Sequence, residues 1–294
     1  CLAIAVEAPP VPAPADAAPP LSLLAEEGPA GAHPLTPLRH ALATAIERGE
    51  PGPGAAANAT RPARLHLAHS WGGGLSSWVH GFCTADDGHE GLVLRSVGRP
   101  GAYGQRLALY PHEAPETPLR AWELELPIHA TAIAHAQYRA ILREIVDDYG
   151  VDSIIVSSLI GHSLDALRAP LPTLLVAHDH YPFCVAIFAH HGSECRSCDL
   201  RRLRDCRENN PGHRFFQGVD AGDWLALRRA FVETVLGRGI AIVAPSPSVA
   251  ARWRALMPEL AAARIETIAH GIELPPAPPF EPPAAGRLRL VKIG

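Results

Sequence analysis

Short apolar segments that suit buried β-strands alternate along this chain with longer segments that suit amphipathic α-helices. Such alternation is typical of a parallel sheet whose strands are buried on both faces. We therefore expect an α/β fold built on a doubly wound, Rossmann-like parallel sheet. The predicted strands are Leu65–His69, Gly91–Val97, Arg106–Tyr110, Trp122–Leu126, Ser153–Val156, Thr173–Ala177, Ile240–Ala244 and Arg264–Ile268. The predicted helices are Leu75–Phe82, Ala130–Tyr149, Gly222–Leu236 and Ser246–Leu256.

Composition limits the partners that a chain of this kind can bind. Its net charge of −4, with 19% charged residues, gives no basic field for nucleic acid. No apolar run approaches the roughly 20 residues of a membrane helix, so we expect no transmembrane segment, and peripheral membrane contact stays open. Four of the six cysteines crowd between residues 184 and 206 rather than forming a framework of disulfides. This crowding fits a reducing, cytoplasmic location.

Three regions differ in composition. Residues 1–62 are rich in Pro and Ala, and we expect a mostly disordered linker with one helix at Leu35–Arg48. Residues 63–274 hold the predicted strands and helices of the folded domain. Residues 275–294 read as a Pro-rich connector followed by the first strand of a further domain. A lone strand lacks partners for its backbone groups, so we expect that this further domain is missing and that the chain is a fragment.

The strand Thr173–Ala177 runs directly into His178, Asp179 and His180. In parallel sheets, ligands bind beyond the carboxyl ends of the strands. His178 and Asp179 are therefore the candidate catalytic residues. The alternative interpretation is that these polar residues cap the next turn of the chain and bond locally.

Two further loops follow predicted strands at the same edge. Gly72, Gly73 and Gly74 join the first strand to a helix, and glycines there let the backbone approach an anionic ligand at the helix N-terminus. Neither a Walker loop nor a dinucleotide fingerprint is present. His162 and Ser163 follow the strand Ser153–Val156 and are candidates for sugar or phosphate contact. A flexible turn and a helix cap are the respective alternatives.

Four cysteines form the pattern C-x10-C-x2-C-x7-C at Cys184, Cys195, Cys198 and Cys206. Four thiolates can satisfy a tetrahedral structural zinc site, which needs no open position. The pair His190–His191 is an alternative source of a ligand. Unliganded thiols and redox chemistry are the other interpretations.

In order along the chain, several segments resemble the N-terminal half of a glycosyltransferase of the GT-B fold, of the family-4-like type. They are the glycine-rich loop in His69–Leu75, the segment Val176–Cys184 with a Cys-bearing insertion behind it, Ile242–Ser246 before an amphipathic helix, and Ile268–Ile272. The resemblance covers roughly residues 64–294.

This resemblance implies transfer of a sugar from a nucleotide-sugar donor to a glycan or lipid-linked acceptor, with retention of anomeric configuration. The chain would supply the acceptor-side domain. His178 would lie beside the transferred sugar and Asp179 would orient it, while Gly72–Gly74 would lie against the donor phosphates or acceptor and His162 with Ser163 would line the acceptor side. Loop amides and helix N-termini would stabilise the leaving diphosphate, so no cofactor is required for catalysis. The family's donor-binding pair of glutamates belongs to a C-terminal domain that these residues do not include.

Two readings of a different class stay open beside the enzyme. One is a non-catalytic module that binds a glycan or other acceptor. The other is a zinc-stapled interaction domain, in which the cysteine cluster itself forms the functional surface.

Overall fold

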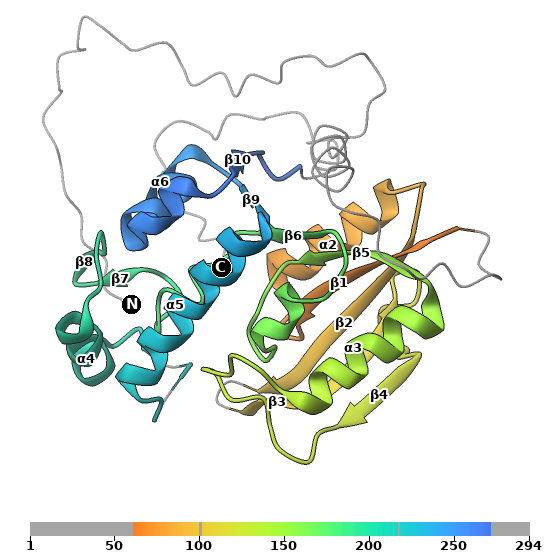
Figure 1. Ribbon diagram of the computed structural model, residues 1–294, viewed down its shortest axis with the longest axis horizontal. Coiled ribbons are helices and arrows are strands. Elements are labelled where there is room, and N and C mark those ends of the chain that lie inside the picture. The colour runs from red at the N-terminus through yellow and green to blue at the C-terminus, as the bar shows by residue number, and fades with distance from the viewer. Residues whose placement is uncertain (1–60, 100–101, 214, 217, 272–294) are drawn as a thin grey trace, which may run out of the picture. The chain divides into compact units, whose positions relative to one another are not determined.

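Eight strands form one mostly parallel sheet in the computed structural model, which describes residues 61–99, 102–213, 215–216 and 218–271 (Figure 1). The strands are β1 (Ala63–His69), β2 (Glu90–Arg99), β3 (Ala102–Pro111), β4 (Arg120–Glu123), β5 (Val151–Val156), β6 (Thr173–Val176), β9 (Ala241–Ala244) and β10 (Ile265–Thr267). Their order across the sheet is β10-β9-β6-β5-β1-β2-β3-β4. The strands from β10 to β2 run parallel, while β3 and β4 run antiparallel to their neighbours. The predicted α/β class is therefore confirmed.

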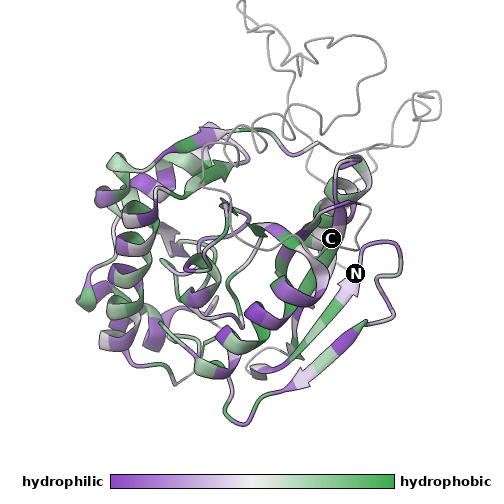
Figure 2. Cartoon of the chain, turned by 45° about the vertical axis from the view of Figure 1, so that its right-hand side comes forward, coloured by the Kyte–Doolittle hydropathy of each residue, from purple (hydrophilic) through white to green (hydrophobic). Residues whose placement is uncertain are grey.

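The described helices are α2 (Gly73–Ala85), α3 (Ala136–Tyr149), α4 (Leu200–Asn209), α5 (Ala221–Arg238) and α6 (Pro247–Leu256), with short 3-10 helices η1 (Leu164–Leu167) and η2 (Pro258–Ala262). The four predicted helices are present, although α3 begins six residues after its predicted start, and α4 is an addition. Ser246 caps α6 as the sequence predicts, since its side chain accepts the N–H of Val249. Hydrophilic and hydrophobic residues interleave along the helices, as Figure 2 shows, which suits helices that pack on one face.

Side chains of the parallel strands alternate between two hydrophobic clusters. In β5, Ile154 and Val156 belong to one cluster and Ile155 to the other. The second cluster contains Trp78 and Phe82 of α2, whereas α3, α5 and α6 contribute to the first. Because the strands bury both sides, β6 and β9 read as short apolar runs rather than as polar–apolar alternation, whereas β1 carries the buried polar side chains of Arg64 and His66.

The strand order reverses at β1. The chain passes from β1 through α2 to β2, β3 and β4, then returns through α3 to β5 on the other side of β1, and continues to β6, β9 and β10. In open α/β sheets, ligands bind beyond the carboxyl ends of the strands at such a reversal. The loops that follow β1 and β5 are therefore the first place to look for a site.

Three details differ from the sequence prediction. The helix predicted from Ala130 begins at Ala136, because the ring of His135 caps it by accepting the N–H of Tyr138 at 3.1 Å. The strand predicted at Trp122–Leu126 lies at Arg120–Glu123. The sheet is not wholly parallel, because the two residues between β2 and β3 are too few for a parallel crossover, which needs a dozen or more.

Several sequence predictions lie outside the described residues. These are the linker at residues 1–60, the helix at Leu35–Arg48, and the connector with its strand at residues 275–294. They stay predictions.

Gly161 occupies a tight position behind β5. Its φ of +76° suits glycine, and a Cβ there would lie 2.0 Å from Oγ and 2.6 Å from Cβ of Ser96. Gly161→Ala should therefore lower the free energy of unfolding by about 2–5 kcal/mol, through backbone strain and overpacking. Urea denaturation measures the change. Gly237→Ala is the control: this exposed glycine of α5 has open space around it, so alanine should raise stability by about 0.5–1 kcal/mol. Equal stability of Gly161→Ala and the parent chain would contradict this account.

Candidate functional site

The candidate site lies at the carboxyl edge of the parallel strands. His69 ends β1, Ser157 follows β5, His178 follows β6 by two residues, and His270 follows β10 by three. The strand register aligns these ends, because β1 pairs in parallel with β5, β5 with β6, β6 with β9 and β9 with β10. The edge that the sequence predicted as the site thus gathers polar residues from separate parts of the chain.

The ring of His178 packs between two other aromatic side chains. It stacks on the ring of His270 with centroids 4.7 Å apart, and it meets the Trp78 ring edge-on, also at 4.7 Å. Trp78 belongs to α2, the helix that follows the glycine loop, and its ring lies 5.4 Å from that of His270. These contacts hold His178 on a fixed wall formed by α2 and the segment after β10.

A second aromatic group surrounds the loop after β1. The rings of His69 and Trp71 stack at 4.3 Å, and the indole of Trp71 also stacks on Phe215 at 4.9 Å. Tyr103, from β3, lies 4.9 Å from Trp71. The His69 ring is close enough to His178 to influence its pKa, which links the two aromatic groups.

Several polar atoms in these two groups have no hydrogen-bond partner among the described residues. A buried polar atom left unpaired costs free energy, so such atoms usually pair with water or a ligand. Unpaired buried atoms also occur elsewhere among the described residues, but the stacked rings beside those at the sheet edge favour a polar ligand there that brings both hydrogen-bonding groups and flat apolar faces. The unpaired atoms at this edge are Nε1 of Trp71, Nε1 of Trp78, Oη of Tyr103, Oγ of Ser157, Nε2 of His178 and Nδ1 of His270.

Burial keeps the histidines of the edge uncharged at neutral pH. Desolvation lowers the pKa of His178 to about 3, with smaller contributions from His270 and His69. Desolvation also lowers the pKa of His69 to about 4 and lowers that of His270. Neutral imidazoles both donate and accept hydrogen bonds, a property that suits sugar hydroxyls better than an anion.

Asp179 directly follows His178 in the loop after β6. Desolvation raises its pKa to about 7, against the opposing effect of the hydrogen bond that its Oδ1 accepts from the Tyr181 N–H at 2.7 Å. A carboxyl group with this pKa can hold or release a proton near neutral pH. Its backbone carbonyl accepts the indole N–H of Trp253 at 3.3 Å, which fixes the loop against α6. Asp179 therefore shapes the loop and also carries an exchangeable proton.

The glycine loop exposes the start of α2. Gly72 and Gly73 have φ of +75° and +71°, and nothing lies within 4 Å of a Cβ placed at Gly72, Gly73 or Gly74. Gly72 caps the helix without a side-chain hydrogen bond, so the first amides of α2 have no side-chain cap. The end of this helix favours negative charge.

His162 and Ser163 have protein partners. The Nε2 of His162 lies 2.9 Å from the Ala68 carbonyl and its Nδ1 lies 2.9 Å from the Tyr138 hydroxyl. The hydroxyl of Ser163 donates to Asp165 at 2.9 Å, and it caps η1. Both residues hold the β5 loop against β1, so their predicted contact with substrate stays a prediction.

The four clustered cysteines line one small pocket of about 10 Å³ behind β6. All five described cysteines are free. Among the described residues, no three His, Cys, Asp or Glu side chains are already grouped as the ligands of a metal ion. The zinc site therefore stays a prediction.

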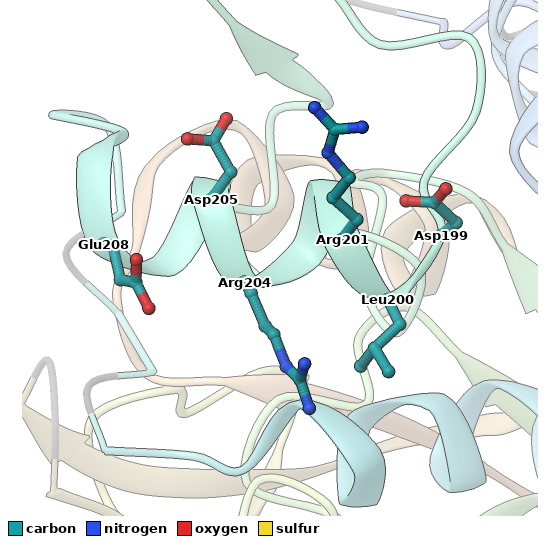
Figure 3. Close-up of a pocket in the computed structure, with 6 residues that line it drawn as sticks. All are labelled: Asp199, Leu200, Arg201, Arg204, Asp205 and Glu208. Carbon is teal, nitrogen blue, oxygen red and sulfur yellow. The ribbon is translucent and has the colours of Figure 1, made fainter.

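Outside the sheet edge, α4 borders an open hollow of about 590 Å³. Figure 3 shows that its side chains point in different directions around the helix and do not converge. They also carry both signs of charge, and we assign no ligand to this hollow. They are Asp199, Leu200, Arg201, Arg204, Asp205 and Glu208.

Comparisons with known proteins gave no match, whether to a protein-family model, a curated protein or a solved structure. Among the described helices, none has the length and apolar character needed to cross a membrane.

Sequence reasoning missed part of this edge. His270 follows a predicted strand, so the rule that selected His178 would have selected it too. Trp78 lies one helical turn beyond the glycine loop, which is a weaker signal. Tyr103 and Phe215 come from an antiparallel strand and from the segment before α5, and no local pattern marks either of them.

Acid should destabilise the fold. Histidines with lowered pKa take up protons on unfolding, so the unfolded state binds more protons below pH 6.5 and stability falls with the pH. The raised pKa values of Asp179 and His89 work the other way, but these two groups oppose four imidazoles whose pKa is strongly lowered. The four are His66 (about 3), His69 (about 4), His162 (about 4) and His178 (about 3).

Urea denaturation from pH 7.5 to pH 4.5 checks this sign. The free energy of unfolding should fall steadily below about pH 6.5. A profile that stays level, or rises on acidification, would contradict the buried neutral state of these histidines.

Proposed function

We propose that this chain supplies the acceptor-side part of a retaining glycosyltransferase, which transfers a sugar from a nucleotide-sugar donor to a glycan or lipid-linked acceptor. The observation that carries the proposal is the set of unpaired buried polar atoms on aromatic side chains at the carboxyl edge of the sheet, beside the strand reversal at β1. The likeness of the sequence motifs to the family-4-like GT-B enzymes agrees with that location.

The chemistry of the edge suits a carbohydrate. Sugars present C–H faces that pack on indole and phenol rings, and hydroxyls that exchange hydrogen bonds with neutral imidazoles. We assign the sugar to the wall formed by Trp78, His178 and His270. Nε2 of His178 would bond to a hydroxyl of the transferred sugar.

The start of α2 suits the leaving group. Sugar transfer from a nucleotide develops negative charge on a diphosphate, and preorganised N–H groups stabilise such charge without a metal. No side chain caps the amides at the start of α2, which leaves them available for this role. Asp179, with a pKa near 7, would hold or release the proton that the acceptor hydroxyl loses.

Two finer descriptions belong with this proposal. The helices contribute to both hydrophobic clusters, which supports a doubly wound sheet. The free cysteines support a cytoplasmic location.

A non-catalytic glycan-binding module is the second candidate. The stacked rings of His69, Trp71 and Phe215 favour it, because an aromatic platform binds sugars without any chemistry. Incubation with labelled nucleotide sugars and a glycan panel separates the two: labelled product supports the enzyme, and saccharide binding without product in a chain extended by its donor domain supports the module.

Removal of the His178 ring tests whether the wall formed by Trp78, His178 and His270 binds a sugar. His178→Ala should weaken saccharide binding to the 294-residue chain about tenfold, since a stacking face and a hydrogen bond are lost together. Saturation-transfer NMR with a panel of oligosaccharides and nucleotide sugars measures the change. His80→Ala, which removes an exposed imidazole from α2, is the matched control and should bind like the parent. Equal affinities of the two variants would remove His178 from the site.

Gly73 and Gly74 are a matched pair of positions for testing the role of the glycine loop. Gly73 has a positive φ and Gly74 does not, although both have open space around them. Gly73→Ala should therefore reshape the start of α2 and weaken the binding of a nucleoside diphosphate about tenfold or more, whereas Gly74→Ala should leave it unchanged. Isothermal titration calorimetry with UDP and GDP measures both. Identical diphosphate affinity for Gly73→Ala and the parent would contradict the assigned role of these amides.

A further inference from the structure

The segment between β6 and α5 brings together four cysteines that lie in different local elements. Cys184 lies in the loop after β6, Cys195 directly follows a two-stranded hairpin of β7 (His190–His191) and β8 (Ser193–Glu194), Cys198 precedes the cap of α4, and Cys206 lies in α4. All four line the same pocket. Sequence spacing alone does not require this arrangement.

Each of the four sulfurs accepts a hydrogen bond from nitrogen. The backbone N–H of Ala189 donates to Sγ of Cys184 at 3.2 Å, and the amide of Asn210 donates to Sγ of Cys206 at 3.1 Å. Two guanidinium groups serve the other pair: Arg228 donates to Cys198 at 3.1 Å and Arg202 to Cys195 at 3.9 Å. Sulfur in a neutral thiol is a weak acceptor, so four such donors favour sulfur atoms that carry negative charge.

Arg228 gives a second, independent indication. Its side chain is buried, with 3% of its surface exposed, and the charge contacts no carboxylate among the described residues. It donates hydrogen bonds to the carbonyl of Cys198, at 2.7 Å, and to the sulfur of the same residue. A buried guanidinium without an anion is costly, and a thiolate cluster would supply that anion.

We propose that Cys184, Cys195, Cys198 and Cys206 bind one divalent metal ion of the zinc class through four thiolates. A four-thiolate zinc centre carries two negative charges, which Arg202 and Arg228 balance. The pocket volume of about 10 Å³ suits a single ion rather than a multi-iron cluster. All four positions around the metal are protein ligands, so the ion is structural and not catalytic.

Metal binding requires the cysteine side chains to change rotamer, since they are not grouped as a ligand set in the structure. The thiols release their protons as the ion binds. His191 does not line the pocket that the four cysteines share, so we do not include it among the ligands.

The cysteine-bearing segment needs an additional stabilising constraint, such as a bound metal ion. In α4, a ten-residue helix, only Leu203 and Cys206 are buried. Two buried residues stabilise a helix of this length poorly, because an isolated helix of about 12–15 residues is already marginal in water. A metal that joins α4, the hairpin and the loop after β6 supplies the missing constraint.

Metal analysis of the purified 294-residue chain tests the proposal. Protein expressed with added zinc and purified under reducing conditions should hold about one zinc per chain by inductively coupled plasma mass spectrometry. Cobalt(II) substitution should give the intense near-ultraviolet absorption of thiolate-to-cobalt charge transfer with the visible bands of a tetrahedral ion. A chain with no bound metal and no such absorption would overturn the site, as would two disulfides among the four cysteines found by mass spectrometry under the same conditions.

Single substitutions test whether the ion is bound by the four clustered cysteines. Cys198→Ser should weaken zinc affinity at least tenfold in competition with a chromophoric chelator, whereas Cys83→Ala, at the buried cysteine of α2, should leave it unchanged. If Cys198→Ser fails to fold, Arg228→Met tests the metal site without removing a ligand. It should weaken zinc binding about 10- to 100-fold through loss of the donor to Cys198. If Arg228→Met instead keeps its zinc affinity and unfolds at higher urea than the parent, the guanidinium does not balance a thiolate centre and the proposal fails.

Discussion

Burial of β1 on both faces is the constraint on which the rest of the structure depends. Leu65 and Leu67 enter one hydrophobic cluster and Ala68 the other, so β1 is stable only with helices on either side. Its two neighbours, β2 and β5, are reached through different helices, and the strand order therefore reverses here. The loops after β1 and β5 therefore lie where ligands bind in open α/β sheets.

Much of this framework could be predicted from the sequence, because short-range sequence patterns decide where these elements form. The runs that became β5, β6 and β9 are apolar, short and bounded by turn residues, so tertiary context had little to change. Ser246 marked the start of α6 for the same reason. The prediction was wrong where a distant contact decides the structure. The start of α3 depends on a bond between the backbone N–H of His135 and Asp165 at 2.6 Å, thirty residues away, and no local pattern reports it.

The residues of the candidate site likewise fall into those that a local sequence pattern predicts and those that only a distant contact brings to the edge. His178 could be predicted because a strand end in a parallel sheet has a known relation to ligands. Tyr103 could not, because only the packing of β3 against β2 and of its ring against Trp71 brings it to the edge. Phe215 reaches the same indole from the far side of the cysteine-bearing segment. A structural change in the cysteine-bearing segment is therefore transmitted to the rings of His69 and Trp71 through the contact between Phe215 and Trp71.

Strand β4 forms one margin of the sheet, and its side chains are mostly exposed. Such a margin is a template on which another chain could add a strand. Here Arg120 turns toward α3, where it pairs with Glu144 and lies 3.0 Å from Asp148, and Arg106 of β3 faces Glu123 at 3.5 Å. A strand that approached this margin would meet paired charges on a segment of four residues. The feature that ties β4 to its own helix thus also discourages polymerisation through the sheet.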